Sequence, residues 1–257
     1  AALGVSPEPI GGSFALDASA SAAGKGAYAA RIALDSIEIR NKHRTDRIRP
    51  TSVSLHTDSA ATRAEAASGD LSLTFSTPQS ADSLIAALTR SARALAGQID
   101  AQSIDMEQLK PALPDFALRV SAGPDNILNS LLKSRKIAFD ALNAEGANCD
   151  SLPVSIRLRT EGLAYGNVVL DTVTADIRQN GKRLEYALGL ANAPGNLDNI
   201  ARAGLYGHLV RNTGQANLYQ RNRAGREGFR FGLDVTWTDS LVRASVTPPD
   251  PLFGFEP

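Results

Sequence analysis

The sequence contains few of the residues that most often build a chemical site. Its 257 residues include one cysteine, one methionine, one tryptophan and three histidines. The single cysteine, Cys149, excludes an internal disulfide and a zinc site built from several cysteines. His43, His56 and His208 lie outside any recognisable catalytic or metal-binding motif. We therefore expect a protein that is not an enzyme and that uses no cofactor or metal.

The chain also lacks an excess of charge and any long apolar run. Its 27 lysines and arginines balance 27 aspartates and glutamates, which disfavours a nucleic-acid partner. No stretch approaches the roughly 20 apolar residues of a transmembrane helix, and there is no signal-peptide pattern. Because the sequence does not begin with methionine and ends among apolar residues, we expect a fragment of a longer protein that carries any targeting or anchoring segment.

Apolar and polar residues alternate through most of the chain. Clear examples are residues 14–18, 28–34, 71–75, 154–158 and 229–237. Alternation with a period of two is typical of antiparallel strands that bury one face, so the sequence predicts a mainly β protein. The alternation changes phase between Leu34 and Ile37, which predicts a bulge or a strand break there.

Short turn sequences separate the predicted strands. Asn180-Gly181, between two alternating runs, is the strongest hairpin signal. It predicts a type I′ turn with positive φ at both residues, and neighbouring strands that pair as a meander.

Helical spacing replaces alternation in one part of the chain. Residues 82–99 have an apolar stripe with a helical period, formed by Leu84, Ile85, Leu88, Ala92, Leu95 and Ile99. We expect this helix to cover strand surface at an edge or mouth of the sheet with that stripe. A second helix is predicted within 124–136 and one helical turn at 106–109, so that 79–136 forms a helical island interrupted by a strand at 116–120.

Two basic stretches leave an alternative open. Residues 40–49 and the arginines within 221–230 indicate either solvated hairpin tips or a patch that binds a headgroup or partner.

Three segments resemble a known protein family. Residues 170–188, LDTVTADIRQNGKRLEYAL, resemble the repeating "Leu-Asp-Ser/Thr, strand, Asn-Gly, strand" units of the TamB translocation and assembly module family, which is AsmA-like. Residues 204–233 are similar to the strands that follow such a unit, and 238–252 to a segment of members from Bacteroides-like bacteria. The resemblance is best over 137–257, and a weaker copy lies at 34–39.

The resemblance implies a fold and a function. The fold is an antiparallel sheet curled into an open, β-taco-like trough with an apolar inside, here with a helical insertion and extending over residues 1–257. Family members are large bridge-like lipid transfer proteins of the periplasm, anchored in the inner membrane. They are associated with phospholipid transport to the outer membrane and with outer-membrane biogenesis. The implied partners are phospholipid acyl chains and an outer-membrane assembly protein of the Omp85 type.

The apolar faces of the matching strands are the candidate lipid groove. The groove residues are predicted to be Leu184, Tyr186, Leu188, Leu190, Phe229, Phe231, Leu233, Val235 and Trp237. The alternative is a β-scaffold in which these side chains form a sealed core and whose surface binds a protein partner in envelope assembly.

Overall fold

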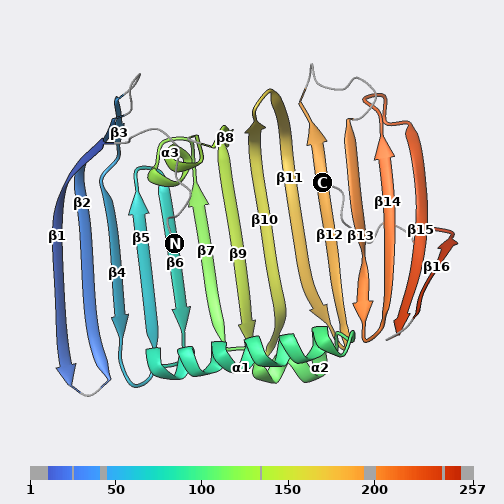
Figure 1. Cartoon of the computed structure of the whole chain (residues 1–257), viewed down its shortest axis with the longest axis horizontal. Coiled ribbons are helices and arrows are strands. Elements are labelled where there is room, and N and C mark those ends of the chain that lie inside the picture. The colour runs from blue at the N-terminus through green and yellow to red at the C-terminus, as the bar shows by residue number, and fades with distance from the viewer. Residues whose placement is uncertain are drawn as a thin grey trace.

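A computed structural model describes residues 11–24, 26–40, 45–133, 135–193, 201–238 and 241–249. Most of these residues form one antiparallel sheet (Figure 1). Its strands are β1 (Gly11–Gly24), β2 (Ala27–Arg40), β3 (Thr45–Ile48), β4 (Thr51–Thr57), β5 (Thr62–Ser68), β6 (Leu71–Thr77), β7 (Phe116–Ala122), β8 (Ile137–Ala138), β9 (Ala141–Cys149), β10 (Leu152–Tyr165), β11 (Val168–Asn180), β12 (Arg183–Asn192), β13 (Arg202–Val210), β14 (Thr213–Arg221), β15 (Glu227–Thr238) and β16 (Leu241–Thr247).

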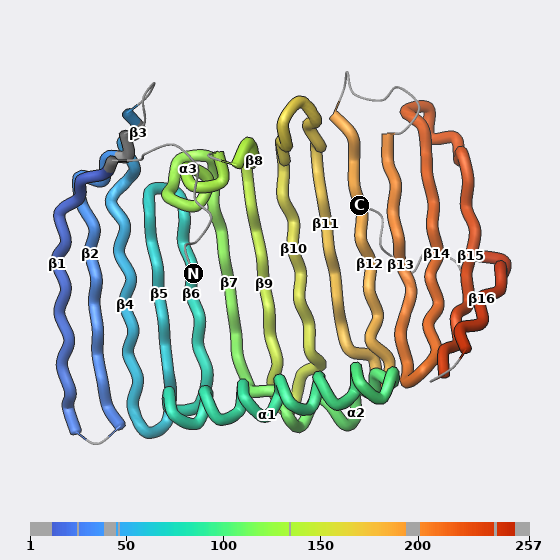
Figure 2. Tube along the Cα trace, viewed as in Figure 1, coloured from blue at the N-terminus to red at the C-terminus, as the bar shows by residue number. Residues whose placement is uncertain are grey.

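The strands follow one another across the sheet in chain order. The path runs β1-β2-β4-β5-β6-β7-β9-β10-β11-β12-β13-β14-β15-β16, while β3 pairs with β2 and β8 with β10. Figure 2 shows these strands side by side in a single layer, with β1 and β16 at its two edges. The prediction of a mainly β, antiparallel sheet that stays open is therefore confirmed, and its form fits a curled trough.

The structure contains both the bulge predicted between Leu34 and Ile37 and the hairpin predicted at Asn180-Gly181, but the turn of the hairpin differs from the predicted type. Opposite Ser13 and Ala15 of β1, strand β2 has an extra residue, and Ser36 there has a φ of 53°, which confirms the bulge. The hairpin between β11 and β12 is also confirmed. Its turn, however, consists of Gly181 and Lys182 between the paired Asn180 and Arg183, and of these residues only Gly181 has a positive φ. The predicted type I′ turn is therefore wrong.

All the α-helices of the described residues fall within the predicted stretch 79–136. They are α1 (Ala81–Asp100), α2 (Met106–Leu109), which continues into a 3₁₀ turn (Lys110–Ala112), and α3 (Ile127–Lys133). Helix α1 crosses the ends of the strands from about β6 to β12 along one margin of the sheet, and α3 lies at the opposite margin (Figure 1).

Threonines at the strand ends hold the start of α1. Thr57 Oγ1 lies 2.8 Å from Thr62 Oγ1 and accepts a hydrogen bond from the Ala81 amide at 3.0 Å. Thr62 Oγ1 donates to the Gln79 carbonyl at 2.9 Å. Because Thr57 and Thr62 are almost fully buried, these bonds fix the point at which the chain leaves β6 and enters the helix.

The end of α1 is held by the β13–β14 turn. Ile104 and Arg211 form an isolated β-bridge, and Arg211 Nε lies 3.3 Å from Asp105 Oδ2. The indole N–H of Trp237 donates to the Gln102 carbonyl. Helix α1 is thus attached at both ends, about 30 Å apart for its twenty residues.

The apolar stripe of α1 does not make the contact predicted for it. Ile85, Leu88, Leu95 and Ile99 are 42–63% exposed. Ala92 is exposed as well, and of the stripe only Leu84 is half-buried. Apart from Leu84, the positions that face the protein are small or polar: Ala87 is buried, Ala94 packs against Met106, Leu109 and Val154, and Ser91 Oγ donates to the Ala112 carbonyl at 2.6 Å. The prediction that the stripe covers strand surface is wrong, because small residues allow the closer approach between the helix and its neighbours.

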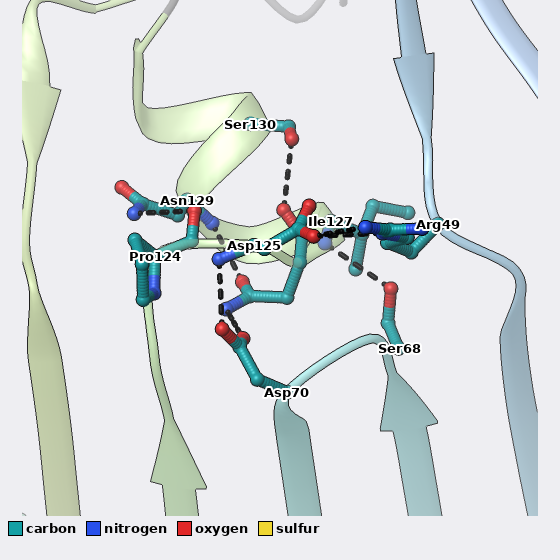
Figure 3. A network of polar contacts seen from close by, with 9 residues as sticks. Arg49, Ser68, Asp70, Pro124, Asp125, Ile127, Asn129 and Ser130 are labelled. Carbon is teal, nitrogen blue, oxygen red and sulfur yellow. Dashed lines mark hydrogen bonds and ion pairs between the residues drawn. The ribbon is translucent and has the colours of Figure 1, made fainter.

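Helix α3 begins in a network of side-chain hydrogen bonds (Figure 3). Asn126 Nδ2 and the Asp125 amide donate to the two carboxylate oxygens of Asp70, at 2.6 and 2.9 Å. Arg49 Nη2 lies 2.6 Å from Asp125 Oδ2, and the Ile127 amide donates to Ser68 Oγ at 3.1 Å. Asp70, in the turn between β5 and β6, thereby positions the start of α3, about fifty-five residues later in the sequence.

This network predicts a dependence of stability on pH. Burial tends to raise the pKa of Asp70, but hydrogen bonds from Asn126 and from the amides of Asp125 and Gly123 outweigh it and lower the pKa. A carboxyl group with a lowered pKa in the folded state adds stability above its unfolded pKa of about 3.9 and loses it as the pH falls through the folded value.

We therefore expect Asp70→Asn to lower the free energy of unfolding at pH 7. The variant should also lose less of this free energy than the wild type as the pH falls from about 4 to about 2. Urea unfolding at several pH values measures both effects. Asp100→Asn, at the exposed end of α1, is the control and should keep the wild-type pH profile. Equal acid profiles for Asp70→Asn and the wild type would contradict the role given to this network.

Candidate functional site

The sheet has one face that is apolar from edge to edge. Residues paired directly across antiparallel strands point to the same face, so the register defines rows that cross the sheet. One row crosses all strands of the path and consists of Ala20, Ala30, Leu55, Ala64, Phe75, Leu118, Gly146, Ile156, Ile177, Tyr186, Gly207, Ala216, Leu233 and Val246. The Tyr186 hydroxyl is its one polar side-chain group.

A second row on this face is apolar throughout. It consists of Ala18, Ile32, Val53, Ala66, Leu73, Val120, Ala144, Leu158, Ala175, Leu188, Leu205, Leu218 and Phe231. We call the face that carries these two rows the apolar face, and the two rows together the apolar ribbon. With strands about 4.8 Å apart, the ribbon is about 60 Å long, perpendicular to the strands.

No second layer of the described chain covers the ribbon. Large side chains on the apolar face are 36% exposed at Phe231 and up to 76% exposed at Val246. The others in this range are Leu16, Tyr28, Ile32, Val53, Leu55, Ile156, Leu188, Phe229 and Val242. Soluble monomers rarely expose an apolar surface of this extent, so the ribbon is the candidate binding surface of the chain.

Helices border the ribbon near the middle of the sheet. At one margin, Met106 and Leu109 of α2 pack against Val154, with Leu184 beside them, on the apolar face. At the other margin, the start of α3 is bonded to Ser68, which lies on the same face and is buried. The apolar ribbon therefore lies between α2 at one margin of the sheet and the start of α3 at the other.

All nine predicted groove residues lie on the apolar face. Leu188, Phe229 and Phe231 are exposed, and the other six are half-buried. Several of the nine also have structural contacts, among them Leu184, which packs against the cluster of Met106, Leu109 and Val154. Tyr186 donates from its hydroxyl to the Gln215 carbonyl at 2.9 Å, and burial raises its pKa, while Trp237 is bonded to the chain between α1 and α2.

The predicted set covers only one end of the ribbon. The rows continue through β1 to β10, where the sequence pattern contained the same alternation at Val53, Leu55, Leu73, Phe75 and Ile156. Those positions are missing from the prediction because it followed the family resemblance, which was best after residue 137.

The opposite face carries most of the charge. We call it the charged face, and its central row includes Arg119, Glu145, Arg157 and Asp176 on four neighbouring strands. Arg119 Nε lies 3.2 Å from Glu145 Oε1, and Arg157 Nε lies 3.2 Å from Asp176 Oδ2. His56 and His208 are also on this face, whereas His43 lies outside the described residues.

A hollow of about 610 Å³ lies mainly on the charged face, between β7 and β14. On one row its lining runs through Arg119, Glu145, Arg157, Asp176, Ala187 and Tyr206. The sequence pattern does not predict this hollow. The resemblance implies an apolar inside for the trough, but at this place the hollowed surface is the charged one.

The described residues contain neither a metal-type cluster of three or more histidine, cysteine, aspartate or glutamate side chains nor a helix long and apolar enough to cross a membrane. The chain matches no protein-family model, no curated protein and no solved structure.

Proposed function

We propose that the apolar ribbon binds phospholipid acyl chains and that the chain is a segment of a bridge-like lipid transfer protein. The observation that carries the proposal is the ribbon itself, because one row crosses the sheet from β1 to β16 and its neighbour runs from β1 to β15, both without a charged side chain. Covering such a surface with hydrocarbon is favourable by about 25 cal/mol per Å² of apolar area.

The shape of the ribbon favours a flexible apolar chain that can shift along it. Exposed large side chains such as Val53, Ile156 and Leu188 are interspersed with small ones such as Ala64, Ala144 and Gly207, so the ribbon is an uneven apolar surface. The borders at α2 and α3 keep the ligand over the two central rows. A path perpendicular to the strands continues across every strand, so that adding strands would lengthen it.

The resemblance to the TamB family supplies the cellular setting of this proposal. In that setting the chain works in the periplasm, in a protein anchored to the inner membrane, and contributes to outer-membrane biogenesis with an assembly protein of the Omp85 type. The open antiparallel sheet supports the resemblance at the level of fold.

The test is to identify lipid on protein purified from a Gram-negative host without detergent. The variant Leu55→Asp/Ile156→Asp puts two carboxylates into one row of the ribbon, at side chains that are 39% and 45% exposed. The matched control, His56→Asp/Ser155→Asp, changes their chain neighbours on the charged face. Native mass spectrometry and lipid extraction measure phospholipid per chain, and thermal melting checks the fold.

We expect the ribbon variant to lose about five-fold or more of the bound phospholipid while the control keeps it, because a carboxylate desolvated under an acyl chain is costly. Equal lipid in both variants would contradict the proposal. Wild-type protein without lipid would also contradict it and would favour the scaffold alternative, in which a protein partner covers the ribbon.

A further inference from the structure

The exposed stripe of α1 has the spacing of a coiled-coil seam. Its exposed members follow one another at intervals of three, four, three and four residues, as Ile85, Leu88, Ala92, Leu95 and Ile99. This is a heptad repeat in which Ile85, Ala92 and Ile99 occupy position a and the two leucines occupy position d. A strict repeat of this kind gives the narrow stripe that fits a second helix, whereas a helix that covers a globular core has a wider one.

The seam lies beside the surface of α1 that contacts the protein. Ala87, Ser91 and Ala94 make those contacts, and each comes one position before a seam residue, which turns the helix surface by about 100°. Helix α1 also runs along a margin of the sheet, where the strands reach it from one side only (Figure 1). The four large seam side chains are 42–63% exposed, so the seam is open to a partner.

Helix α1 is held in place before any partner binds. Thr57 and Thr62 fix its start, and Arg211 and Trp237 fix the chain that follows it. Isolated helices of this length are marginal in water, and the cost of ordering them opposes association. Because α1 is anchored at both ends, pairing along the seam does not have to offset that cost.

The residues around the seam favour a second copy of the same helix. Between Ile85 and Ile99, the positions that flank the seam are all uncharged: Thr89, Ser91, Ala96 and Gln98. Charges at these positions usually select a different partner helix, and like charges would repel an identical one. Isoleucine at position a with leucine at position d is the combination that favours two parallel helices.

A membrane surface suits α1 less well than a helix does. Helices that lie in a lipid interface are typically rich in lysine and arginine on their polar face. Helix α1 contains two arginines and two aspartates, Arg90, Arg93, Asp82 and Asp100, and therefore offers no net charge to anionic headgroups.

We propose that α1 pairs in parallel with α1 of a second copy of the chain, as a two-stranded coiled coil. The seam has five side chains from each copy, which is small beside the interfaces of about 1,200–2,000 Å² in stable complexes. The dimer is therefore weak and reversible, and the chain is monomeric in dilute solution. The pairing uses a margin of the sheet and does not depend on lipid binding to the apolar ribbon.

The test is sedimentation equilibrium of the whole chain from about 10 μM to about 1 mM. Leu88→Asp puts a carboxylate into the seam. Its control is Ala86→Asp, because Ala86 is exposed on the same helix but lies outside the repeat. We expect the wild type and the control to approach twice the mass of one chain, and Leu88→Asp to raise the dissociation constant about ten-fold or more. Circular dichroism checks that each variant is folded.

Disulfide formation tests the parallel arrangement. In a Cys149→Ser background, which removes the one native thiol, Ala92→Cys should give a cross-linked dimer with oxidised glutathione, because parallel helices bring this position close to its own copy. Ala86→Cys is the control and should cross-link about ten-fold less, because it lies away from the partner helix. Equal cross-linking at the two positions, or none at Ala92→Cys, would contradict the parallel pairing.

A chain that stays monomeric up to about 1 mM would overturn the proposal, as would a dimer that Leu88→Asp leaves unchanged. The ribbon variant Leu55→Asp/Ile156→Asp separates this surface from the ribbon. We expect it to keep the dimer while it loses lipid. A dimer that is lost in this variant would place the interface on the apolar ribbon instead.

Discussion

Ala87→Asp will destabilise the chain by about 4 kcal/mol, whereas Leu88→Asp, at the next position of α1, will cost no more than about 1 kcal/mol. Ala87 is 2% exposed, so an aspartate there would place an unpaired carboxylate where water cannot solvate it. Leu88 is 52% exposed, and its replacement would remain in solvent. Equilibrium unfolding in urea, followed by the far-ultraviolet circular dichroism of the strands, measures the two free energies.

The comparison tests which side of α1 supports the fold. The two substitutions introduce the same residue one position apart in the same helix, so helix propensity and net charge change in a similar way. Equal, large losses for both variants would mean that the stripe with Leu88 packs against the sheet after all. Binding of a hydrophobic dye should fall in Leu88→Asp, because the stripe that it interrupts is already exposed.

The strands and their faces were largely predictable because alternation is a local property. The alternation within each strand is enough to predict which of its side chains share a face. Short turns then make pairing with the next strand along the chain the simplest arrangement. The continuity of the ribbon needed the register as well. That Leu118, Gly146, Ile156 and Ile177 are aligned depends on turn geometry between β7 and β11, which the pattern of a single strand does not contain.

The packing side of α1 was not predictable from its apolar stripe. A helical period shows which residues form the apolar stripe, but it does not show whether the stripe contacts the rest of the protein, a ligand or solvent. Here the contacts use Ala87, Ser91 and Ala94 and the anchors at both helix ends, which come from strands remote in sequence.

The charged hollow was missed for a related reason. Its members come from seven strands, and nothing in the sequence brings Arg119 close to Asp176 before the register is known. One signal was present, because Arg119, Glu145, Arg157 and Asp176 alternate in sign from strand to strand while each occupies the polar phase of its own strand.

Asn129→Ala will destabilise the region around α3 by about 3 kcal/mol. Asn129 is fully buried, and its side chain donates to the carbonyls of Pro124 and Phe139, at 3.0 and 2.8 Å, and accepts from the Phe139 amide at 3.3 Å. Alanine leaves these three backbone groups without a partner, in a site where Phe139 is only 3% exposed. The expected loss exceeds the net contribution of one hydrogen bond, because each of these buried backbone groups stays removed from water without a partner to compensate.

Ser130→Ala is the matched control for Asn129→Ala, one position along the same helix. It removes one hydrogen bond, from Ser130 Oγ to the Asn126 carbonyl, and that carbonyl still accepts from the Ser130 amide. We expect a cost of no more than about 1 kcal/mol for the control. Hydrogen exchange locates the effect, because the Phe139 amide should lose its protection in Asn129→Ala while amides in β12 and β13 keep theirs. Equal stability of the two variants, with Phe139 still protected, would show that the bonds of Asn129 do not hold α3 to the sheet.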